Sequence, residues 1–256
     1  MKLRLKPPAC ETCPLYHREW LLEEGKWDHL LALAGNPNTG KSTLFNALTG
    51  LRQHVGNWPG KTVTRAEGGF SFGGKRYKVV DLPGTYSLLT MSPEEEIARD
   101  FLLFGRPDAV IVVMDATMLE RNLNLTLQIL EITPRVVVAL NLMDEARRRG
   151  IRVNVPGLSR ELGVPVVPTV ARRGQGLRRL LETVQGVIDG RIPTHPRRVR
   201  LDPALEAAVE TLVPLLLEAF PGLPHARWIA LRLLDGDPSI RRAVETGELA
   251  QLIPSP

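Results

Sequence analysis

Cysteine is scarce in this sequence: only Cys10 and Cys13 occur among 256 residues. Two cysteines do not supply the crosslinks of a disulfide-rich secreted domain, so we expect a reducing compartment. Long apolar runs are also absent. None approaches the ~18 residues that a membrane helix needs, and residues 1–28 lack the apolar core of a secretory signal. We therefore predict a soluble, cytoplasmic polypeptide, which is compatible with its being one part of a longer membrane protein.

No single sign of charge dominates the chain. The formal net charge is +5, from 33 basic and 28 acidic residues, and 43% of the residues are hydrophobic. This is a normal globular profile with enough apolar residues for a sizeable core. The basic excess includes the clusters Arg147–Arg149 and Arg197–Arg200. These clusters permit contact with a nucleic acid or an anionic membrane but do not require either.

Residues 29–43, HLLALAGNPNTGKST, hold the pattern around which we interpret the chain. An apolar run predicts a strand, a helix-forming stretch follows, and between them lies a match to the G-x-x-x-x-G-K-[ST] phosphate-binding loop. Glycines let backbone N–H groups surround phosphate oxygens, and the helix N-terminus adds a favourable dipole. Lys41 is expected to reach the β- and γ-phosphates and Ser42 to ligate Mg²⁺. The predicted nucleotide contacts are Gly35, Asn36, Pro37, Asn38, Thr39, Gly40, Lys41, Ser42 and Thr43.

Strand and helix patterns alternate after this loop. Two strands joined at Gly73-Gly74 are predicted within residues 66–84, and residues 51–64 predict an irregular, mobile loop because they are rich in glycine and proline. The runs AVIVVM and VVVAL are typical of strands that are covered on both faces. We therefore predict an α/β fold with a mainly parallel P-loop sheet and helices on both faces. The predicted bounds are strands at 109–115, 135–141 and 164–170, helices at 41–49, 94–103, 119–132, 158–162 and 177–188, and a basic turn at 145–150.

Composition divides the chain into four predicted segments: an N-terminal extension at 1–28, the α/β domain at 29–190, a Pro/Arg-rich linker at 191–200 and a small all-helical domain at 201–256. In the last, Asp202-Pro203 and Asp237-Pro238 predict helix starts. The Cys10-x-x-Cys13 pair fits half of a metal site, a redox pair or a turn, and we favour the turn. His17 lies near enough to join a metal site, although a solvated histidine is the simpler interpretation.

Asn141-Leu142-Met143-Asp144 follows a predicted strand and has the pattern N-x-x-D. A carboxylate at Asp144 accepts both the N1–H and the exocyclic amine of guanine, which adenine does not offer. Such a site rejects ATP because its own polar atoms would stay unpaired. We therefore predict GTP and GDP as ligands, with a backbone N–H at Ala171 facing guanine O6. The predicted contacts on this side are Asn141, Met143, Asp144, Val170, Ala171 and Arg172.

Two further segments are predicted to respond to the γ-phosphate. Asp81 ends a strand beside the phosphate loop and is expected to hold Mg²⁺ through water, while the Gly84 N–H contacts the γ-phosphate. In residues 51–64, Thr62 is the expected second hydroxyl on Mg²⁺, with Thr64 as its competitor. Gly60 is expected to lie beside the nucleotide.

The order of these motifs resembles that of TRAFAC-class GTPases. More narrowly, GNPNTGKSTLFNALTG, VGNWPGKTVT, DLPGTYSL and NLMD resemble the cytoplasmic GTPase domain of the ferrous-iron transport protein B (FeoB) family over residues 30–190. Residues 226–237, ARWIALRLLDGD, resemble the helical, GDI-like domain of that family, which favours GDP retention. The resemblance implies a GTPase on the cytoplasmic face of the inner membrane. Its implied partner is the membrane-embedded iron permease region of the same full-length protein, and a homo-oligomer is possible.

The resemblance also implies a K⁺ site formed by the Asn38 side chain and the backbone carbonyls of Gly56 and Trp58. A cation there would neutralise charge that develops between the β- and γ-phosphates. Thr85-Tyr86 stand where Ras-like proteins have a water-positioning glutamine, so slow intrinsic hydrolysis is expected. Val170 stands where the guanine loop of the family often has serine, which predicts faster nucleotide release. The expected catalytic residues are Lys41, Asn38, Thr62 and Gly84.

Two functional hypotheses follow from the sequence. The first is a regulatory GTP switch that acts on an iron-transporting membrane region absent from this chain. The second is a soluble RNA- or ribosome-associated GTPase, suggested by the arginine clusters. In a further interpretation, residues 195–256 are a passive docking module.

Overall fold

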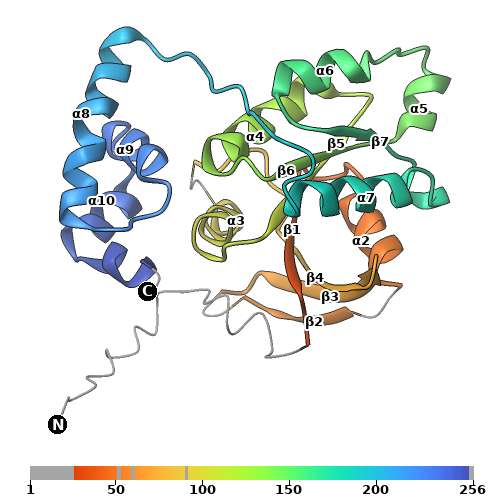
Figure 1. Cartoon of the computed structure of the whole chain (residues 1–256), viewed down its shortest axis with the longest axis horizontal. Coiled ribbons are helices and arrows are strands. Elements are labelled where there is room, and N and C mark those ends of the chain that lie inside the picture. Colours follow the sequence, from red (N-terminus) through yellow and green to blue (C-terminus); the bar gives the residue numbers. More distant parts are fainter. Residues whose placement is uncertain (1–25, 51–52, 59–60, 90–91, 254–256) are drawn as a thin grey trace.

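A mainly parallel sheet forms the centre of the computed structural model, which describes residues 26–50, 53–58, 61–89 and 92–253 (Figure 1). The strand order is β2-β3-β4-β1-β5-β6-β7. The five strands from β4 to β7 in this order are parallel, whereas β2 and β3 are added antiparallel. The predicted sheet is thus confirmed. The strands are β1 (His29–Gly35), β2 (Gln53–Asn57), β3 (Thr64–Phe72), β4 (Lys75–Asp81), β5 (Ala109–Asp115), β6 (Val136–Asn141) and β7 (Val166–Pro168).

Helices cover both faces of this sheet, as predicted (Figure 1). Helices α2 (Lys41–Thr49) and α7 (Leu177–Ile188) pack on one face, and α3 (Pro93–Phe104), α4 (Leu119–Ile132) and α6 (Val155–Leu162) pack on the other. Neighbouring residues of β1 alternate between the two layers: Leu31 faces α2 and α7, whereas Leu30 faces α3 and α4. Both are fully buried. Because each strand is covered on both sides, its sequence is apolar without interruption.

Three helices, α8 (Pro203–Ala219), α9 (Ala226–Leu234) and α10 (Pro238–Glu245), form the helical part of the chain beside α3, followed by the short 3₁₀ helix η2 (Glu248–Leu252) (Figure 1). The predicted caps are present: the Asp202 carboxylate accepts from the Ala204 N–H at 2.9 Å, and the Asp237 carboxylate accepts from the Ser239 N–H at 3.0 Å. Trp228 of α9 belongs to the same apolar cluster as the residues of α3. Within the described part of the chain, no helix is long and apolar enough to cross a bilayer.

Residues 53–57 differ from the prediction. They form the edge strand β2 instead of an irregular loop, with Gly56 opposite Arg65 of β3. An edge strand pairs on one side only, so it tolerates a glycine that would weaken a central strand. Residues 51–52 and 59–60, including the predicted nucleotide contact Gly60, lie outside the described residues, as do Cys10, Cys13 and His17.

The predicted basic turn at 145–150 is also wrong, because helix α5 (Met143–Arg148) occupies most of it. Glu145 forms ion pairs with Arg148 at 3.1 Å and with Arg149 at 2.9 Å. These three- and four-residue spacings suit a helix and offset repulsion among the consecutive arginines. Strand β7 has three residues, so it is shorter than the predicted 164–170.

Candidate guanine-nucleotide site

The phosphate loop connects β1 to α2 and depends on its glycines. Gly40 caps α2 with φ 82°, and a Cβ atom there would overlap the side-chain amide of Asn141. A Cβ atom on Gly35 would lie 2.6 Å from the carbonyl oxygen of Val113. Asn38 also has a positive φ, 65°, at the top of the loop. The loop therefore lies against β5 and β6 more closely than other residue types allow.

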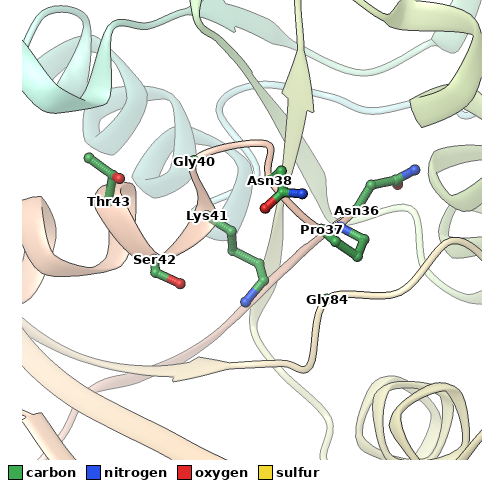
Figure 2. Close-up of a pocket in the computed structure, with 8 residues that line it drawn as sticks. All are labelled: Asn36, Pro37, Asn38, Gly40, Lys41, Ser42, Thr43 and Gly84. Carbon is green, nitrogen blue, oxygen red and sulfur yellow. The ribbon is translucent and has the colours of Figure 1, made fainter.

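A cavity of about 530 Å³ opens at this loop. Figure 2 shows Lys41 and Ser42 at the start of α2, Asn38 above them, and Gly84 on the segment that faces the loop. The structure thus brings together eight of the predicted contacts. The lining residues are Asn36, Pro37, Asn38, Gly40, Lys41, Ser42, Thr43 and Gly84.

Lys41 forms an ion pair with Asp81, which is also a hydrogen bond. The two residues meet because β4 is the parallel neighbour of β1, with Asp81 in register with Leu33. Only 10% of the Lys41 side chain and 12% of the Asp81 side chain are exposed. Burial raises the pKa of Asp81, and the nearby Lys41 ammonium opposes that shift. The pair places a cation in the lining of the cavity and an anion directly behind that cation, each desolvated enough to interact strongly with a charged ligand.

Asn141, at the end of β6, joins two loops. Its amide nitrogen donates to the Thr39 carbonyl at 2.9 Å, and its oxygen accepts from the Ala171 N–H at 3.0 Å and from the Thr169 hydroxyl at 3.3 Å. Asn141 is only 1% exposed. It therefore fixes the phosphate loop relative to the loop after β7. In this structure the Ala171 N–H points to Asn141, so its predicted contact with guanine O6 stays a prediction.

Asp144 lies in the first turn of α5, beside that bridge. Its Oδ2 accepts a hydrogen bond from Arg172 of η1 (Ala171–Arg173), and this bond holds the pKa of Asp144 below its usual range. The other oxygen, Oδ1, is buried and has no hydrogen-bond partner within the described residues. A buried carboxylate oxygen without a donor is costly unless a ligand supplies one.

The segment after β4 packs against the phosphate loop. Gly84 lies close to Pro37, since a Cβ atom there would be 3.4 Å from the Pro37 backbone. Thr85 follows and is 6% exposed, with its hydroxyl donating to the Ser87 carbonyl at 2.7 Å. The Tyr86 ring lies under the Arg121 guanidinium, 4.2 Å from its centroid. Thr85 and Tyr86 are therefore engaged in contacts with their own loop and with helices α3 and α4.

The structure does not bring Thr62, Gly56 and Trp58 to the cavity lining. Thr62 is exposed, and Gly56 lies in the edge strand β2. Trp58 is 1% exposed and packs edge-on against Phe101 of α3 at 5.9 Å. The Trp58 carbonyl accepts from the Lys61 N–H at 3.0 Å. A K⁺ site made from these carbonyls therefore requires β2 and Trp58 to move.

Sequence reasoning missed two residues that organise the site. The Arg121 carbonyl accepts a hydrogen bond from the Asn36 side chain at 3.0 Å, and the Thr169 hydroxyl donates to Asn141. Their partners are 85 and 28 residues away in sequence, and no local sequence pattern predicts such pairs. Thr169 precedes the predicted guanine contacts directly, which was the only available signal.

Two side chains at the phosphate loop carry oxygen atoms of the kind that Mg²⁺ binds. Within the described ranges, no group of three or more His, Cys, Asp or Glu side chains is placed to hold a metal ion. Mg²⁺ usually keeps several waters and takes one or two protein oxygens together with phosphate oxygens. The Ser42 hydroxyl and the Asp81 carboxylate supply oxygen ligands of that kind.

Comparison with known proteins assigns both parts of the chain. The family model described as ferrous iron transport protein B matches residues 29–184, and the model of the FeoB cytosolic helical domain matches residues 202–254. A Porphyromonas gingivalis Fe(2+) transport protein A/Fe(2+) transporter FeoB fusion protein is 45% identical over 84% of this chain and 26% of its own length. The Fe(2+) transporter FeoB of Escherichia coli is 43% identical over 86% of this chain and 28% of its own length.

Solved structures agree with this assignment. The cytosolic domain of L. pneumophila FeoB is 38% identical, with a TM-score of 0.77 over 87% of this chain and 88% of that one. An S. thermophilus NFeoB mutant bound to GDP is 38% identical, with a TM-score of 0.76 over 88% and 86% of the two chains. The family models, the relatives and the fold converge, and this chain therefore belongs to the ferrous iron transport protein B family, of which it carries the G domain and the cytosolic helical domain.

Proposed function

We propose that this chain binds GTP and hydrolyses it slowly to GDP and phosphate. The observation that carries the proposal is the Asn141 bridge, because one buried amide connects the phosphate loop to the loop after β7. The bridge sets a phosphate-binding cavity beside Asp144, whose buried Oδ1 has no donor within the described part of the chain. The GDP bound to the S. thermophilus relative supports the same ligand class.

The ion pair between Lys41 and Asp81 can open when nucleotide binds, because the phosphates then become the partner of Lys41 and Mg²⁺ the partner of Asp81. Mg²⁺, when bound, would draw charge from the β- and γ-phosphates. Ser42, Asp81 through water and Thr62 would hold it, while Lys41 turns from Asp81 to the phosphates. Because Asp81 is desolvated and its pKa is raised, its anionic form gains from a nearby cation. Thr62 joins the metal only when it moves toward the cavity.

K⁺ stimulation is part of the proposal. Asn38 stands at the cavity lining, whereas Gly56 and Trp58 reach it only after the rearrangement described above. A monovalent cation at Asn38 would offset charge that builds up between the phosphates. Since the Thr85 hydroxyl and the Tyr86 ring are engaged by other protein groups, neither side chain orients an attacking water in this arrangement, which agrees with slow intrinsic hydrolysis.

The chain spans only about a quarter of the length of the curated relatives that it matches. We propose that it acts at the cytoplasmic face of the membrane as the GTP-dependent regulator of a ferrous iron permease region in the same full-length protein. Family membership favours this hypothesis over a soluble RNA- or ribosome-associated GTPase.

Two measurements test the proposed function. Calorimetry with GTP and with ATP should show binding of GTP alone, because only guanine offers two donors to Asp144. GTP hydrolysis should be faster in K⁺ than in Na⁺ for the wild type, whereas Asn38→Ala should hydrolyse GTP at the same rate in both salts. Equal binding of both nucleotides contradicts guanine recognition, and equal rates under all four conditions remove the role of K⁺.

A further inference from the structure

The ion pair between Arg172 and Asp144 is asymmetric. The Asp144 side chain is 12% exposed, whereas 51% of the Arg172 side chain is exposed. The guanidinium bonds to Oδ2 and leaves the buried Oδ1 without a donor. Arg172 can therefore turn into water and keep its own charge hydrated, whereas Asp144 is held by α5 and is left without its cation until a ligand supplies hydrogen-bond donors.

Guanine recognition requires both of these oxygens. The N1–H and the exocyclic amine of the base bond in parallel to the two oxygens of one carboxylate. Oδ1 accepts a donor in the present arrangement, but Oδ2 accepts one only after Arg172 has moved. Arg172 and the base therefore compete for the same oxygen, and the half-exposed guanidinium is the partner that can be displaced.

We propose that Arg172 is a displaceable counterion that gates the entry of guanine nucleotides at Asp144. It keeps the carboxylate compensated until the base arrives, and it swings into solvent when the base binds. It returns to Oδ2 as the base leaves. Arg172 is thus a positioning residue for nucleotide exchange. The inference rests on the proposed recognition of guanine by Asp144.

The neighbouring Arg173 provides a matched control. It is exposed, and although its charge also acts on Asp144, it forms no ion pair with any residue in the described part of the chain. Arg172→Gln and Arg173→Gln remove the same charge from adjacent positions, so both weaken the attraction of the anionic nucleotide equally. Only Arg172→Gln also removes the competitor for Asp144. The two variants should therefore change the association rate in different directions.

The experiment measures association and dissociation of GDP labelled on its ribose, by stopped-flow fluorescence. We expect Arg172→Gln to associate roughly two to five times faster than the wild type, the range that a half-exposed ion pair supports. Arg173→Gln should associate no faster than the wild type, and Arg172→Lys, which keeps a cation at Asp144, should lie within about twofold of it. Thermal unfolding confirms that each variant is folded.

Each outcome of these measurements either supports or overturns the proposed gate. Slower association or weaker affinity in Arg172→Gln would mean that Arg172 supports the bound base, and an unchanged rate would mean that the pair does not compete; both overturn the gate. If the wild type binds labelled GDP and unlabelled ADP fails to displace it, the proposed guanine recognition stands whatever the Arg172 variants do. Absence of GDP binding by the wild type overturns both proposals.

Discussion

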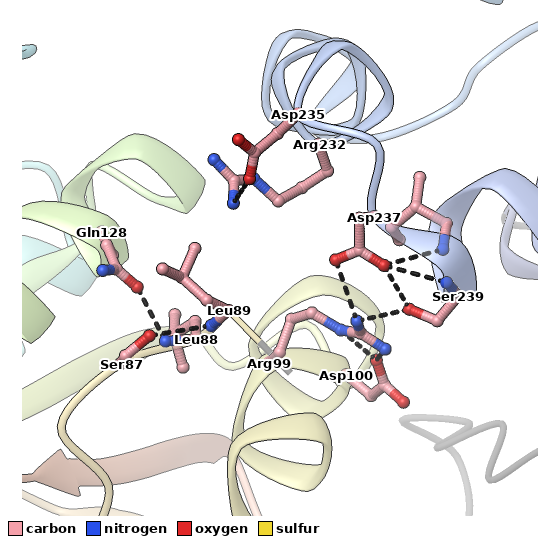
Figure 3. A network of polar contacts seen from close by, with 11 residues as sticks. Ser87, Leu88, Leu89, Arg99, Asp100, Gln128, Arg232, Asp235, Asp237 and Ser239 are labelled. Atoms are coloured by element: carbon pink, nitrogen blue, oxygen red, sulfur yellow. Dashed lines mark hydrogen bonds and ion pairs between the residues drawn. The ribbon is translucent and has the colours of Figure 1, made fainter. Parts of the chain in front are cut away.

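Arg99 of α3 donates a hydrogen bond of 2.7 Å to the Ser239 hydroxyl at the start of α10, 140 residues further along the chain. Its guanidinium also pairs with Asp100 at 2.7 Å and lies 3.7 Å from Asp237, the residue that caps α10 (Figure 3). Only 4% of the Arg99 side chain is exposed. A buried charge network therefore attaches the helical part of the chain to α3.

Removing this buried guanidinium should destabilise the protein strongly. Arg99→Met leaves Asp100 and Asp237 without their shared cation, and breaking a buried ion pair from one side costs about 3 kcal/mol or more. The control Arg241→Met removes an exposed pair with Glu245 on α10 and should cost less than about 0.5 kcal/mol. Urea unfolding of both variants measures the difference. Equal free energies of unfolding would contradict a structural role for the network.

Trp58 should report the nucleotide state. Its ring is buried against Phe101 and lies 5.4 Å below the Arg65 guanidinium, so formation of the K⁺ site would expose it to water. We expect its emission to shift to longer wavelength when a non-hydrolysable GTP analogue replaces GDP in K⁺ buffer. The variant Trp58→Phe identifies the signal among the four tryptophans of the chain. An identical spectrum in both nucleotide states would show that the surroundings of Trp58 do not change with the nucleotide.

His225 should make stability depend on pH. Burial lowers the pKa of His225, opposed by hydrogen bonds to the backbone at Ile132 of α4 and Leu103 of α3, while the Arg106 charge lowers it further. Because the folded pKa lies below the unfolded value of about 6.5, the contribution of neutral His225 is complete above pH 6.5 and is lost as the pH falls through the folded pKa.

Urea unfolding between pH 7.5 and 5.5 measures this dependence. We expect the free energy of unfolding to fall below pH 6.5 by up to about 1.4 kcal/mol per pH unit. His225→Asn keeps a residue that tolerates the left-handed conformation at φ 57°, and it should flatten the profile. A profile as steep as that of the wild type would assign the dependence to other groups.

Asp144→Asn should change the base specificity of the site from guanine to xanthine. An amide offers one donor and one acceptor, so it no longer matches the two donors of guanine but matches the N1–H and carbonyl of xanthine. We expect GDP affinity to fall at least about 100-fold and xanthosine diphosphate to bind in its place. Glu161→Gln, which alters an exposed carboxylate on α6, controls for the loss of charge. Unchanged GDP affinity would remove Asp144 from the site.

The sequence was sufficient to predict the elements that hold the phosphate loop. The predicted bounds of α2, β5, α4 and α7 agree with the structure, because their apolar residues recur with an unambiguous period. The predicted caps Asp202 and Asp237 are present for a similar reason, since a capping side chain and the backbone that it serves are local in sequence.

Interactions between distant segments were not predictable in this way. Glycines suggested a loop at 53–57, whereas pairing with β3 makes it a strand. Asn141 was expected at the guanine base but ties together two loops, and Ser239, one partner of Arg99, lies 140 residues away. Such pairs are set by tertiary packing, which overrides local preference.

The outermost position of β2 has a mechanical consequence for the proposed cycle. A single ladder of five residue pairs attaches it to β3, and no described strand lies beyond it. Its detachment would leave the order from β3 to β7 continuous, together with the Asn141 bridge. Strand β2, which has to move in the proposed cycle, is therefore the strand whose detachment disturbs the nucleotide-binding loops least. The edge of the sheet can open while the central strands keep the loops that bind the base in place.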